Sequence, residues 1–550
     1  MRTSVQAASL LLFTSLFILA TYNLPDWIPA DLYLRIDPLL GIGAILARKE
    51  IIARVLWSLI ILGGTLVVGR FFCAYACPMG ASLDFLGILF FQKKPQGDFP
   101  KGPSLRKVKF ILLFLFLSAA LGGLSLGFFL DPISLLTRVY ALFFYPLAIT
   151  LINLLMDLLR PLLQTLGWIG LAHWHTPQPV FYLVLFTFLI FAALIGLNRY
   201  ASRFWCRYLC PLGAFLALVS PLGVFKRRVS DQCNDCRKCQ KNCPMGAIEE
   251  NPRGTRRSEC IQCRTCAQVC PKEAITFSPA RKRPTVGGEY SAVDVSRRGF
   301  LYSFTGGLTL AFLAERTPFA PLRGKRQLIR PPGALPEDDF LQTCIRCGEC
   351  MKSCITNTLQ PCLWDGGLTG LWTPKLETRY AACEQNCNVC GKVCPTQAIR
   401  SVSLEEKNHA KIGTAILRKE MCLVWAEDKI CLICDEICPY NAIVFRTIEG
   451  YRRPVVIPSR CNGCGWCEVK CPVKGDSAIA VVPHGEIRLK DGSYVKEAKK
   501  LQLEFKADPG DDQFILQKSG LKAEEGKEKK EERAIEPPAK VQPQKPKGFL

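Results

Sequence analysis

The cysteine residues of this chain recur in one spacing, and that spacing is the strongest restriction on how the chain folds. Of its 550 residues 29 are cysteine, and most of them fall into six similar groups. The groups are CNDCRKCQKNCP from Cys233, CIQCRTCAQVCP from Cys260, CIRCGECMKSCI from Cys344, CEQNCNVCGKVCP from Cys383, CLICDEICP from Cys431 and CNGCGWCEVKCP from Cys461. Most groups supply three closely spaced thiols and then a fourth, which is usually followed by proline.

This pattern, Cys-x2-Cys-x2-Cys-x3-Cys-Pro, is typical of bacterial ferredoxins, which bind 4Fe–4S clusters. Three closely spaced thiolates hold one cubane, while the fourth reaches a neighbouring cluster and the proline turns the chain away. Zinc sites use two cysteine pairs separated by a longer loop, and a disulfide framework would not repeat such triplets. The sequence therefore predicts six 4Fe–4S clusters. Five groups continue into a tail that ends in Ala-Ile, and we expect this pair to pack against a cluster.

The two groups before residue 290 form a compact pair. The predicted ligand sets are Cys233, Cys236, Cys239 and Cys270 for one cluster, and Cys260, Cys263, Cys266 and Cys243 for the other. The later groups depart from the pattern twice, because three residues separate Cys383 from Cys387 and eight residues separate Cys422 from Cys431. Spacing alone leaves the pairing of the four later groups open. Cys362 is left over, and we interpret it as a small buried hydrophobic residue.

Four more cysteines lie in the apolar N-terminal part, in two stretches that look like copies of each other. The copies are RFFCAYACPMG, with Cys73 and Cys77, and RFWCRYLCPLG, with Cys206 and Cys210. The i, i+4 spacing puts both thiols of a copy on one helix face. If the two helices pack together, four thiolates converge and bind a seventh cluster or a metal ion. The alternative is a pair of buried or redox-active dithiols; a permanent disulfide does not suit a reducing face.

The residues before 226 are apolar enough to cross a membrane several times. A crossing helix needs about 20 mostly apolar residues, and cytoplasmic loops carry an excess of Lys and Arg. The strongly basic loops are 70–109 and 199–228, so both lie inside and an even number of crossings separates them. We therefore place Val139–Met156 in a re-entrant or interfacial helix on the outer side. The four expected spans are Thr3–Pro25, Val55–Gly69, Phe110–Leu130 and Thr176–Asn198.

A feature of exported proteins lies in the middle of the chain, at Ser296-Arg297-Arg298-Gly299-Phe300-Leu301. It resembles a twin-arginine signal, although the usual following lysine is Tyr302 here. That export route carries folded cargo, and a domain whose clusters are built inside must fold before it crosses. No Ala-x-Ala cleavage site follows, so we expect an uncut fifth helix with the later groups outside. The alternative is a buried or amphipathic helix, with everything after it inside.

These features predict a multi-domain fold, an α-helical transmembrane bundle joined to α+β two-cluster modules of the bacterial ferredoxin type. The expected parts are a transmembrane domain 1–225, a two-cluster domain 226–290, the fifth helix 291–317, a linker 318–338, a four-cluster domain of two modules 339–510 and a disordered tail 511–550. The protein would be a multi-pass protein of a bacterial or archaeal inner membrane, in contact with lipid. Its first ferredoxin block would be cytoplasmic and its later block extracytoplasmic.

Composition argues against other partners and cofactors. The formal net charge is +23, which we assign mainly to loops beside the membrane because no nucleic-acid motif accompanies it. No Cys-x-x-Cys-His segment for c-type haem occurs, and the chain has only four histidines for any other haem. No Gly-x-Gly-x-x-Gly or Walker segment indicates a flavin, a nicotinamide cofactor or ATP.

Residues 1 to about 482 resemble two known subunits fused end to end. The first half, with its spans, twin Cys-x3-Cys-Pro motifs and two-cluster ferredoxin, resembles the NapH-type membrane quinol dehydrogenases; NosR- and CcoG-type proteins share the paired motif. The half from Ser296 resembles the NapG/MauM-type ferredoxins, which begin with a twin-arginine signal and carry four 4Fe–4S motifs. The resemblance implies that the outer motifs pair together and the inner motifs pair together. The implied sets are Cys344, Cys347, Cys350 with Cys471; Cys461, Cys464, Cys467 with Cys354; Cys383, Cys387, Cys390 with Cys438; and Cys422, Cys431, Cys434 with Cys394.

The favoured function is electron transfer between the quinone pool and a redox partner protein, with quinol oxidation near the outer face by resemblance. Candidates for a quinone site there are His173, His175, Asp131 and Arg138, with the histidines as proton acceptors, although such residues more often only face the interface. A second hypothesis is an electron donor that matures or repairs the metal centre of another enzyme, as the NosR- and CcoG-type resemblance allows. A redox sensor is the weakest hypothesis, because no signalling module is visible.

Overall fold

The computed structural model describes residues 2–21, 25, 27–90, 104–279, 296–316 and 328–505. Residues 318–327 of the expected linker and the expected tail 511–550 lie outside these residues. Helices make up most of the N-terminal part. They are α1 (Arg2–Leu19), α2 (Leu32–Arg35), α3 (Pro38–Arg48), η1 (Ala53–Trp57), α4 (Ser58–Val68), α5 (Phe71–Tyr75), α6 (Pro78–Phe90), α7 (Ser104–Leu121), η2 (Gly127–Phe129), α8 (Pro132–Val139), η3 (Tyr140–Phe144), α9 (Tyr145–Thr165), α10 (Ile169–Ala172), α11 (Val184–Gly196), η4 (Leu197–Arg199), η5 (Trp205–Leu209), α12 (Pro211–Val219) and η6 (Ser220–Leu222).

Two regions with short helices and two-stranded sheets follow, separated by helix α15 (Arg297–Arg316). The first block, residues 225–279, contains β1 (Phe225–Val229), α13 (Lys238–Lys241), α14 (Thr265–Gln268) and β2 (Ile275–Pro279). The second block, residues 328–505, contains α16 (Glu337–Thr343), α17 (Glu349–Lys352), β3 (Leu359–Pro361), α18 (Gly367–Gly370), β4 (Pro374–Leu376), α19 (Val389–Lys392), α20 (Leu404–His409), β5 (Thr414–Leu417), η7 (Lys419–Met421), α21 (Leu423–Ala426), α22 (Ile433–Glu436), β6 (Ile443–Ile448), β7 (Tyr451–Val456), α23 (Trp466–Val469), β8 (Ile479–Val482) and α24 (Tyr494–Lys500). The antiparallel pairs are β1 with β2, β3 with β4, β5 with β8 and β6 with β7.

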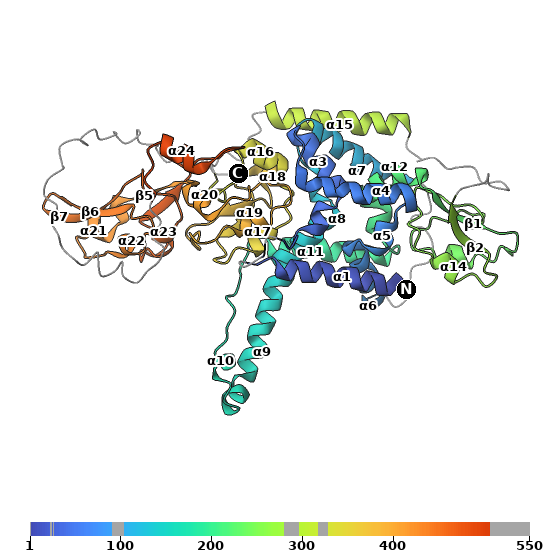
Figure 1. Ribbon diagram of the computed structural model, residues 1–550, viewed down its shortest axis with the longest axis horizontal. Helices are drawn as coiled ribbons and strands as arrows, with labels where there is room; N and C mark the ends of the chain where they lie inside the picture. Colours follow the sequence, from blue (N-terminus) through green and yellow to red (C-terminus); the bar gives the residue numbers. More distant parts are fainter. Residues whose placement is uncertain are drawn as a thin grey trace, which may run out of the picture. The chain divides into compact units, whose positions relative to one another are not determined.

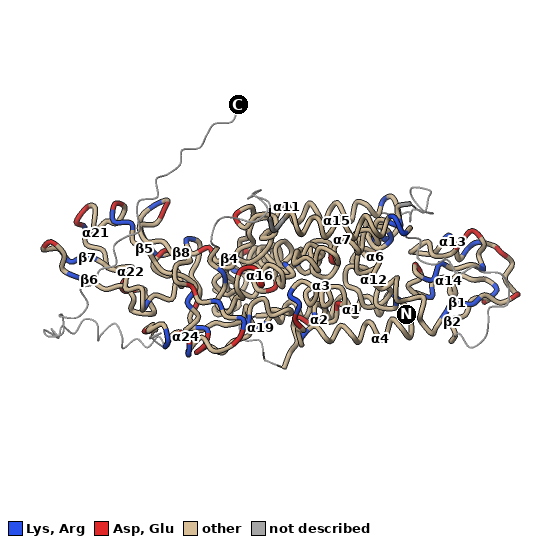
Figure 2. Tube along the Cα trace, turned by 90° about the horizontal axis from the view of Figure 1, so that it is seen from above, with Lys and Arg blue, Asp and Glu red and all other residues tan. Residues whose placement is uncertain are grey.

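Three helical stretches are long and apolar enough to cross a membrane, judged by length and composition. They are Arg2–Leu19, Phe71–Phe90 and Pro132–Thr165. Shorter apolar helices accompany them in the same part of the chain. Figure 2 shows that α4 and α11 carry no Lys, Arg, Asp or Glu, whereas these residues gather on the two strand-containing blocks.

The helix bounds differ from the segments expected from sequence. Residues 71–90 were expected in a basic inner loop, but the structure makes them helices α5 and α6. Asp84, which lies on α6, is paired inside the fold with Arg203 (Nη2 to Oδ2, 2.8 Å) and with Arg2. Val139–Met156 lies within the long helical stretch 132–165, and Thr176–Asn198 is helical only from Val184.

Helices α7 and α15 run side by side (Figure 1). Small residues let their backbones approach closely, as in helix pairs within membranes. A Cβ atom at Gly307 would overlap Ser118 of α7, and a Cβ atom at Gly122 would overlap the side chain of Ala311. Because residue numbers rise together in these two contacts, α15 is parallel to α7.

The first block is bound to the N-terminal part through basic side chains. Lys109 Nζ lies 2.5 Å from a carboxylate oxygen of Glu259. The guanidinium of Arg106 donates to the carbonyl oxygen of Gly246 (3.1 Å), and that of Arg207 donates to the carbonyl oxygen of Pro244 (3.0 Å). Arg2, at the start of α1, donates to Thr265 Oγ1 (3.4 Å).

The second block contacts other residues of the same helices. Lys352 Nζ and Ser353 Oγ both donate to the carbonyl oxygen of Ala20, just after the end of α1, at 2.8 and 2.7 Å. Ser125 Oγ, just after the end of α7, donates to the carbonyl oxygen of Gln342 (2.5 Å). The first block therefore meets the first residues of α1 and α7, and the second block meets the residues that follow their ends.

Candidate iron–sulfur sites

The cysteines of the first block gather into two groups of four. A cavity of about 20 Å³ is lined by Cys243, Cys260, Cys263 and Cys266. Cys239 interacts electrostatically with Cys233 and Cys236, and it packs in one apolar cluster with Cys270. The structure thus brings together the same sets that the spacing predicts.

In the second block each of the first two groups of cysteines also surrounds a small cavity. A cavity of about 20 Å³ is lined by Cys344, Cys347, Cys350 and Cys394. A cavity of about 30 Å³ is lined by Cys354, Cys383, Cys387 and Cys390. The first and second groups along the chain have therefore exchanged their fourth cysteines.

The third and fourth groups of cysteines in this block have also exchanged their fourth cysteines. Cys438 interacts electrostatically with the triplet Cys461, Cys464 and Cys467. Cys471 packs in one apolar cluster with Cys422 and Cys431, and Cys434 interacts with both of these. Cys471 thus completes the set of the third group.

The structure contradicts the pairing of outer with outer and inner with inner motifs that the resemblance implies. Cys394, and not Cys471, joins Cys344, and Cys354 joins Cys383 rather than Cys461. The physical reason is local closure. The hairpin β6–β7 separates the third group from the fourth and returns the chain so that Cys438 meets the fourth triplet, and closing such a short loop costs little conformational entropy.

The surroundings of these thiols fit 4Fe–4S clusters. Backbone N–H groups donate to the sulfurs, at 3.3 Å from Ala247 to Cys243 and at 3.3 Å from Ala442 to Cys438; such bonds help to set cluster potentials. Burial raises the pKa of the Cys260 thiol to about 12, so a thiolate there needs a compensating cation, which bound iron supplies.

The Ala-Ile pairs that follow five of the groups were expected to pack inward. All are buried, at 1–6% exposure: Ala247 and Ile248, Ala274 and Ile275, Ala398 and Ile399, Ala442 and Ile443, and Ala478 and Ile479. Ile248 and Ile275 pack in one cluster with Cys239 and Cys266. The expectation that these pairs line the cysteine sites is confirmed for this block.

The two Cys-x3-Cys-Pro copies of the N-terminal part meet inside the fold. Cys77 interacts electrostatically with Cys73 and Cys206, and Cys210 interacts with all three of the others. Cys210 is the N-cap of α12, where its sulfur accepts from the backbone N–H of Gly213 at 3.2 Å. This convergence makes a site of four thiols, which we call the membrane quartet after the transmembrane domain that the sequence predicts for these residues.

Two buried arginines flank the membrane quartet, and sequence reasoning missed them. A Cβ atom added at Gly213 would lie 2.9 Å from Arg70 Nη2. A Cβ atom added at Gly80 would lie 3.3 Å from Arg203 Nη2. Each copy therefore lays its arginine against the glycine of the other copy. The signal was in the repeat, since both copies begin with Arg three residues before the first cysteine and end with Gly. Two cations beside four thiols offset the negative charge of a thiolate-bound cluster.

Within the described residues, no three His, Cys, Asp or Glu side chains converge closely enough to hold a single metal ion. Cys362 is fully buried, as expected, and its sulfur accepts a long contact from Arg330 Nη1 (3.8 Å).

The structure does not bring the four quinone-site candidates together. His173 and His175 are exposed beside α10, whereas Asp131 and Arg138 are fully buried. Asp131 caps α8 by accepting from the backbone N–H of Ser134 (2.8 Å), and Arg138 Nε donates to the carbonyl oxygen of Arg346 (2.7 Å). The buried pair holds the fold together at this point, so it does not form a pocket with the histidines.

Comparison with known protein families agrees with these sites. Residues 51–96 and 180–230 match the model of a 4Fe-4S binding domain, and these two segments contain the membrane quartet. Residues 225–284 match the model of a 4Fe-4S dicluster domain, which covers the first block. The cysteines present therefore fit 4Fe–4S clusters, which supply one-electron transfer where they are bound.

Curated relatives match about a third of this chain. The methylamine utilization ferredoxin-type protein MauM of Methylorubrum extorquens is 38% identical over 169 residues, which is 29% of this chain and 75% of that protein. MauM of Paracoccus denitrificans is 37% identical over 186 residues, 32% of this chain and 80% of that protein. The ferredoxin-type protein NapG of Escherichia coli is 32% identical over 201 residues, 34% of this chain and 85% of that protein.

No solved structure is similar enough to count as a match. The cysteine quartets, the two domain models and these relatives agree on one chemistry. The chain belongs to the ferredoxin-type proteins that include MauM and NapG, and it is an iron–sulfur electron carrier.

Proposed function

We propose that this protein carries electrons across a membrane, between the quinone pool and a redox partner protein. The observation that carries the proposal is that the two cysteine-rich blocks contact opposite ends of the same helices. The first block would face the cytoplasm and the second the outer side. Residues 1–225 would form the membrane domain, which resembles NapH-type quinol dehydrogenases.

Helix α1 supports this arrangement most directly. Arg2 at its start bonds Thr265 of the first block, and Ala20 just after its end accepts from Lys352 and Ser353 of the second block. The 18 residues of α1 rise about 27 Å at 1.5 Å each, close to the roughly 30 Å of a bilayer's hydrocarbon core.

Helices α7 and α15 support the same direction. Lys109 near the start of α7 bonds Glu259 of the first block, and Ser125 after its end bonds Gln342 of the second. Because α15 is parallel to α7, a chain that enters α15 on the side of the first block leaves it on the side of the second. This direction is the one that the twin-arginine-like motif predicts.

An electron path needs a series of neighbouring clusters, and the packing of the cysteines supports one. One apolar core contains Cys73 and Cys210 of the membrane quartet, Cys347 of the second block and, at its edge, Cys260 and Cys263 of the first block. In the second block the backbone N–H of Cys383 donates to the carbonyl oxygen of Cys464 (2.8 Å). Electrostatic interactions link Cys350 with Cys390 and Cys434 with Cys467. In this proposal the quartets hold seven clusters, one of them in the membrane domain.

Helix α9 fits an interfacial position. Figure 1 shows α9 and α10 extending away from α1, α7 and α15. Many of its apolar side chains are exposed, among them Leu151, Leu154, Leu155 and Leu158. In the proposed arrangement this exposed apolar helix lies against lipid near the second block.

The sidedness of the second block tests the proposal. We expect a reporter fused after Phe505 to be active only when it is of the kind that works outside the cytoplasm. Changing Arg297→Lys and Arg298→Lys together should abolish this signal, because the export signal depends on both arginines. The measurement is the activity of an outside reporter and an inside reporter, each in cells with and without the two changes.

A matched control is Arg316→Lys at the end of the same helix, which should leave the outside signal unchanged. If the inside reporter is active, and its activity is the same with and without the two arginine changes, the proposal is wrong. The second block would then face the cytoplasm, and a soluble cytoplasmic partner would be favoured.

The membrane quartet should be indispensable for transfer between the blocks. We expect Cys73→Ala or Cys206→Ala to remove one cluster, about four iron ions per chain. Electrons given to the first block should then no longer reach the second. Iron analysis and the separate bleaching of the two blocks' absorbance measure this, and Cys362→Ala serves as the control. Full iron content in both quartet variants would show that these thiols act as dithiols.

A further inference from the structure

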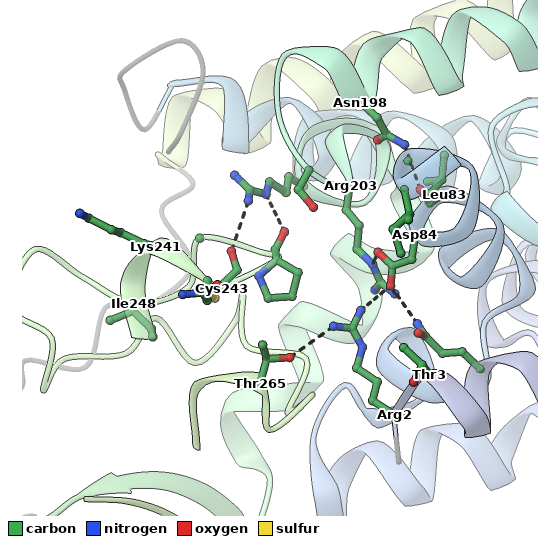
Figure 3. Close-up of a pocket in the computed structure, with 18 of the residues that line it drawn as sticks. Arg2, Thr3, Leu83, Asp84, Asn198, Arg203, Lys241, Cys243, Ile248 and Thr265 are labelled. Atoms are coloured by element: carbon green, nitrogen blue, oxygen red, sulfur yellow. Dashed lines mark hydrogen bonds and ion pairs between the residues drawn. The ribbon is translucent and has the colours of Figure 1, made fainter. Parts of the chain in front are cut away.

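A cavity of about 340 Å³ opens where the membrane domain meets the first block. Its lining comes from the start of α1, from α6, from residues 198–207 and from the loop after α13 (Figure 3). This size lies within the range of small-molecule sites, which are typically about 300–1,000 Å³. Neither the cysteine motifs nor the family matches account for it.

The cavity lies between two cysteine sites. Cys243, which belongs to a quartet of the first block, lines it directly. Arg203 lines it from the other side, and the same guanidinium donates to the carbonyl oxygen of Cys73 (2.8 Å) and interacts with Cys206 and Cys77. A molecule in this cavity would therefore adjoin one quartet and the arginine that flanks a second.

One wall of the cavity is polar and carries excess positive charge. Figure 3 shows Arg2 and Arg203 both directed at Asp84. Arg203 Nη2 lies 2.8 Å from Asp84 Oδ2, and Gln6 Nε2 donates to the same oxygen at 3.0 Å. Two guanidiniums outweigh one carboxylate, so the wall favours a ligand with electron-rich oxygen atoms.

The helix that carries Asp84 also gives the cavity an apolar part, which continues onto the outside of the helices. Leu83, Gly87 and Ile88 of α6 line it. Ile88 is 62% exposed, and the neighbouring Phe85 and Leu89 are exposed as well. An apolar ligand could thus reach the cavity along α6 from the lipid, while exposed Lys241 and Asn242 lie at its aqueous side.

We infer that this cavity binds the ring of a quinone or quinol, at the end of the membrane domain that faces the first block. The inference rests on the proposed function and places its substrate at a site other than the outer-face residues expected from sequence. Oxidation of a quinol releases two electrons and two protons. The quartet that includes Cys243 and the quartet behind Arg203 can take one electron each. The protons can leave to water past Lys241 and Asn242, and quinone reduction is the reverse.

The test fills the cavity without straining the backbone. A Cβ at Gly87 would meet only Asn198 Nδ2, at 3.9 Å, so Gly87→Phe should fold and occupy the space. We expect the Kd of a radiolabelled short-chain naphthoquinone, measured on the full-length protein in lipid nanodiscs, to rise about tenfold or more. Gly87→Ala should bind as the unchanged protein does, and Gly87→Leu should fall between the two.

The matched control is Gly63→Phe on α4, where a Cβ would meet nothing within 4 Å. It should leave both the Kd and the iron content unchanged. An unaltered Kd in Gly87→Phe would overturn the inference. So would an unaltered Kd accompanied by loss of a co-purified anionic phospholipid, which would make the cavity a headgroup site.

A kinetic measurement separates this inference from the proposed function. Short-chain naphthoquinol should bleach the cluster absorbance of the unchanged protein, and the apparent KM should rise in Gly87→Phe. If naphthoquinol fails to bleach clusters that dithionite bleaches, the quinone link of the proposed function fails. If it bleaches the unchanged protein and Gly87→Phe equally, only the position of the site is wrong.

Discussion

A chain that carries Cys344→Ala and Cys394→Ala together should lose about four iron ions, no more than either single variant loses. Both residues line the same small cavity, so the second change removes a ligand from a cluster that is already lost. A chain with Cys344→Ala and Cys471→Ala should instead lose about eight, because the structure assigns these cysteines to different sets. Iron and acid-labile sulfide per chain measure both results.

The pairing implied by resemblance predicts the reverse outcome, which makes the experiment decisive. Under that pairing Cys344 and Cys471 share a cluster, and Cys394 belongs to another. Cys362→Ala is the control, since it lies outside every quartet and should keep all iron. Non-additive loss in the Cys344 and Cys471 combination would contradict the ligand sets proposed here.

The second large effect concerns the contact between the first block and the N-terminal helices. Glu259→Gln should destabilise this contact by about 3–5 kcal/mol, the usual cost of removing one partner from a buried ion pair. Glu259 is buried at 4% exposure and lies 2.5 Å from Lys109 Nζ and 3.6 Å from Arg70 Nη1. Its loss leaves buried cations without a counter-charge.

This contribution should depend on pH in a defined direction. Burial alone would raise the pKa of Glu259, but Lys109, Arg70 and Arg106 outweigh it and lower the pKa below its usual 4.5. A carboxylate whose pKa is lowered by folding stabilises the folded protein fully above the unfolded value. The contribution is lost as the pH falls through the lowered pKa, where the unchanged protein and Glu259→Gln should converge.

Thermal release of the first block, followed by its cluster absorbance in nanodiscs, measures the effect. Glu250→Gln is the matched control, because Glu250 belongs to the same block but is exposed. Equal midpoints for Glu259→Gln and the unchanged protein at pH 7 would mean that the buried cations find other partners.

Local sequence patterns predicted the chemistry of the sites well, because the cysteine triplets are formed by short segments. The triplet from Cys344 needs only seven residues of chain to gather three thiols. The fourth ligand depends on how the chain returns, and the β6–β7 hairpin that decides this in the last module carries no cysteine. Spacing therefore left the pairing of the four later groups open. The ligand sets implied by the resemblance were wrong for Cys354 and Cys394.

Charge patterns were a poorer guide to the helices. The excess of Lys and Arg over residues 70–109 favoured an inner loop, whereas residues 71–90 form helices α5 and α6. The charged side chains of Arg70 and Asp84 are compensated inside the fold. Their partners come from distant parts of the chain: Arg203 and Arg2 for Asp84, and the carbonyl oxygen of Ser258 for Arg70 (2.7 Å). Such long-range compensation cannot be recognised in a local window of sequence.

The exchange of arginine and glycine between the two Cys-x3-Cys-Pro copies has a consequence for biogenesis. Residues 70–80 and 203–213 each contribute two cysteines to the membrane quartet, so the site is incomplete during synthesis until the later copy has packed against the earlier one. A fragment that stops before residue 203 would hold only Cys73 and Cys77 of the four ligands. Loading of this site would then require that the helices between the two copies have folded correctly.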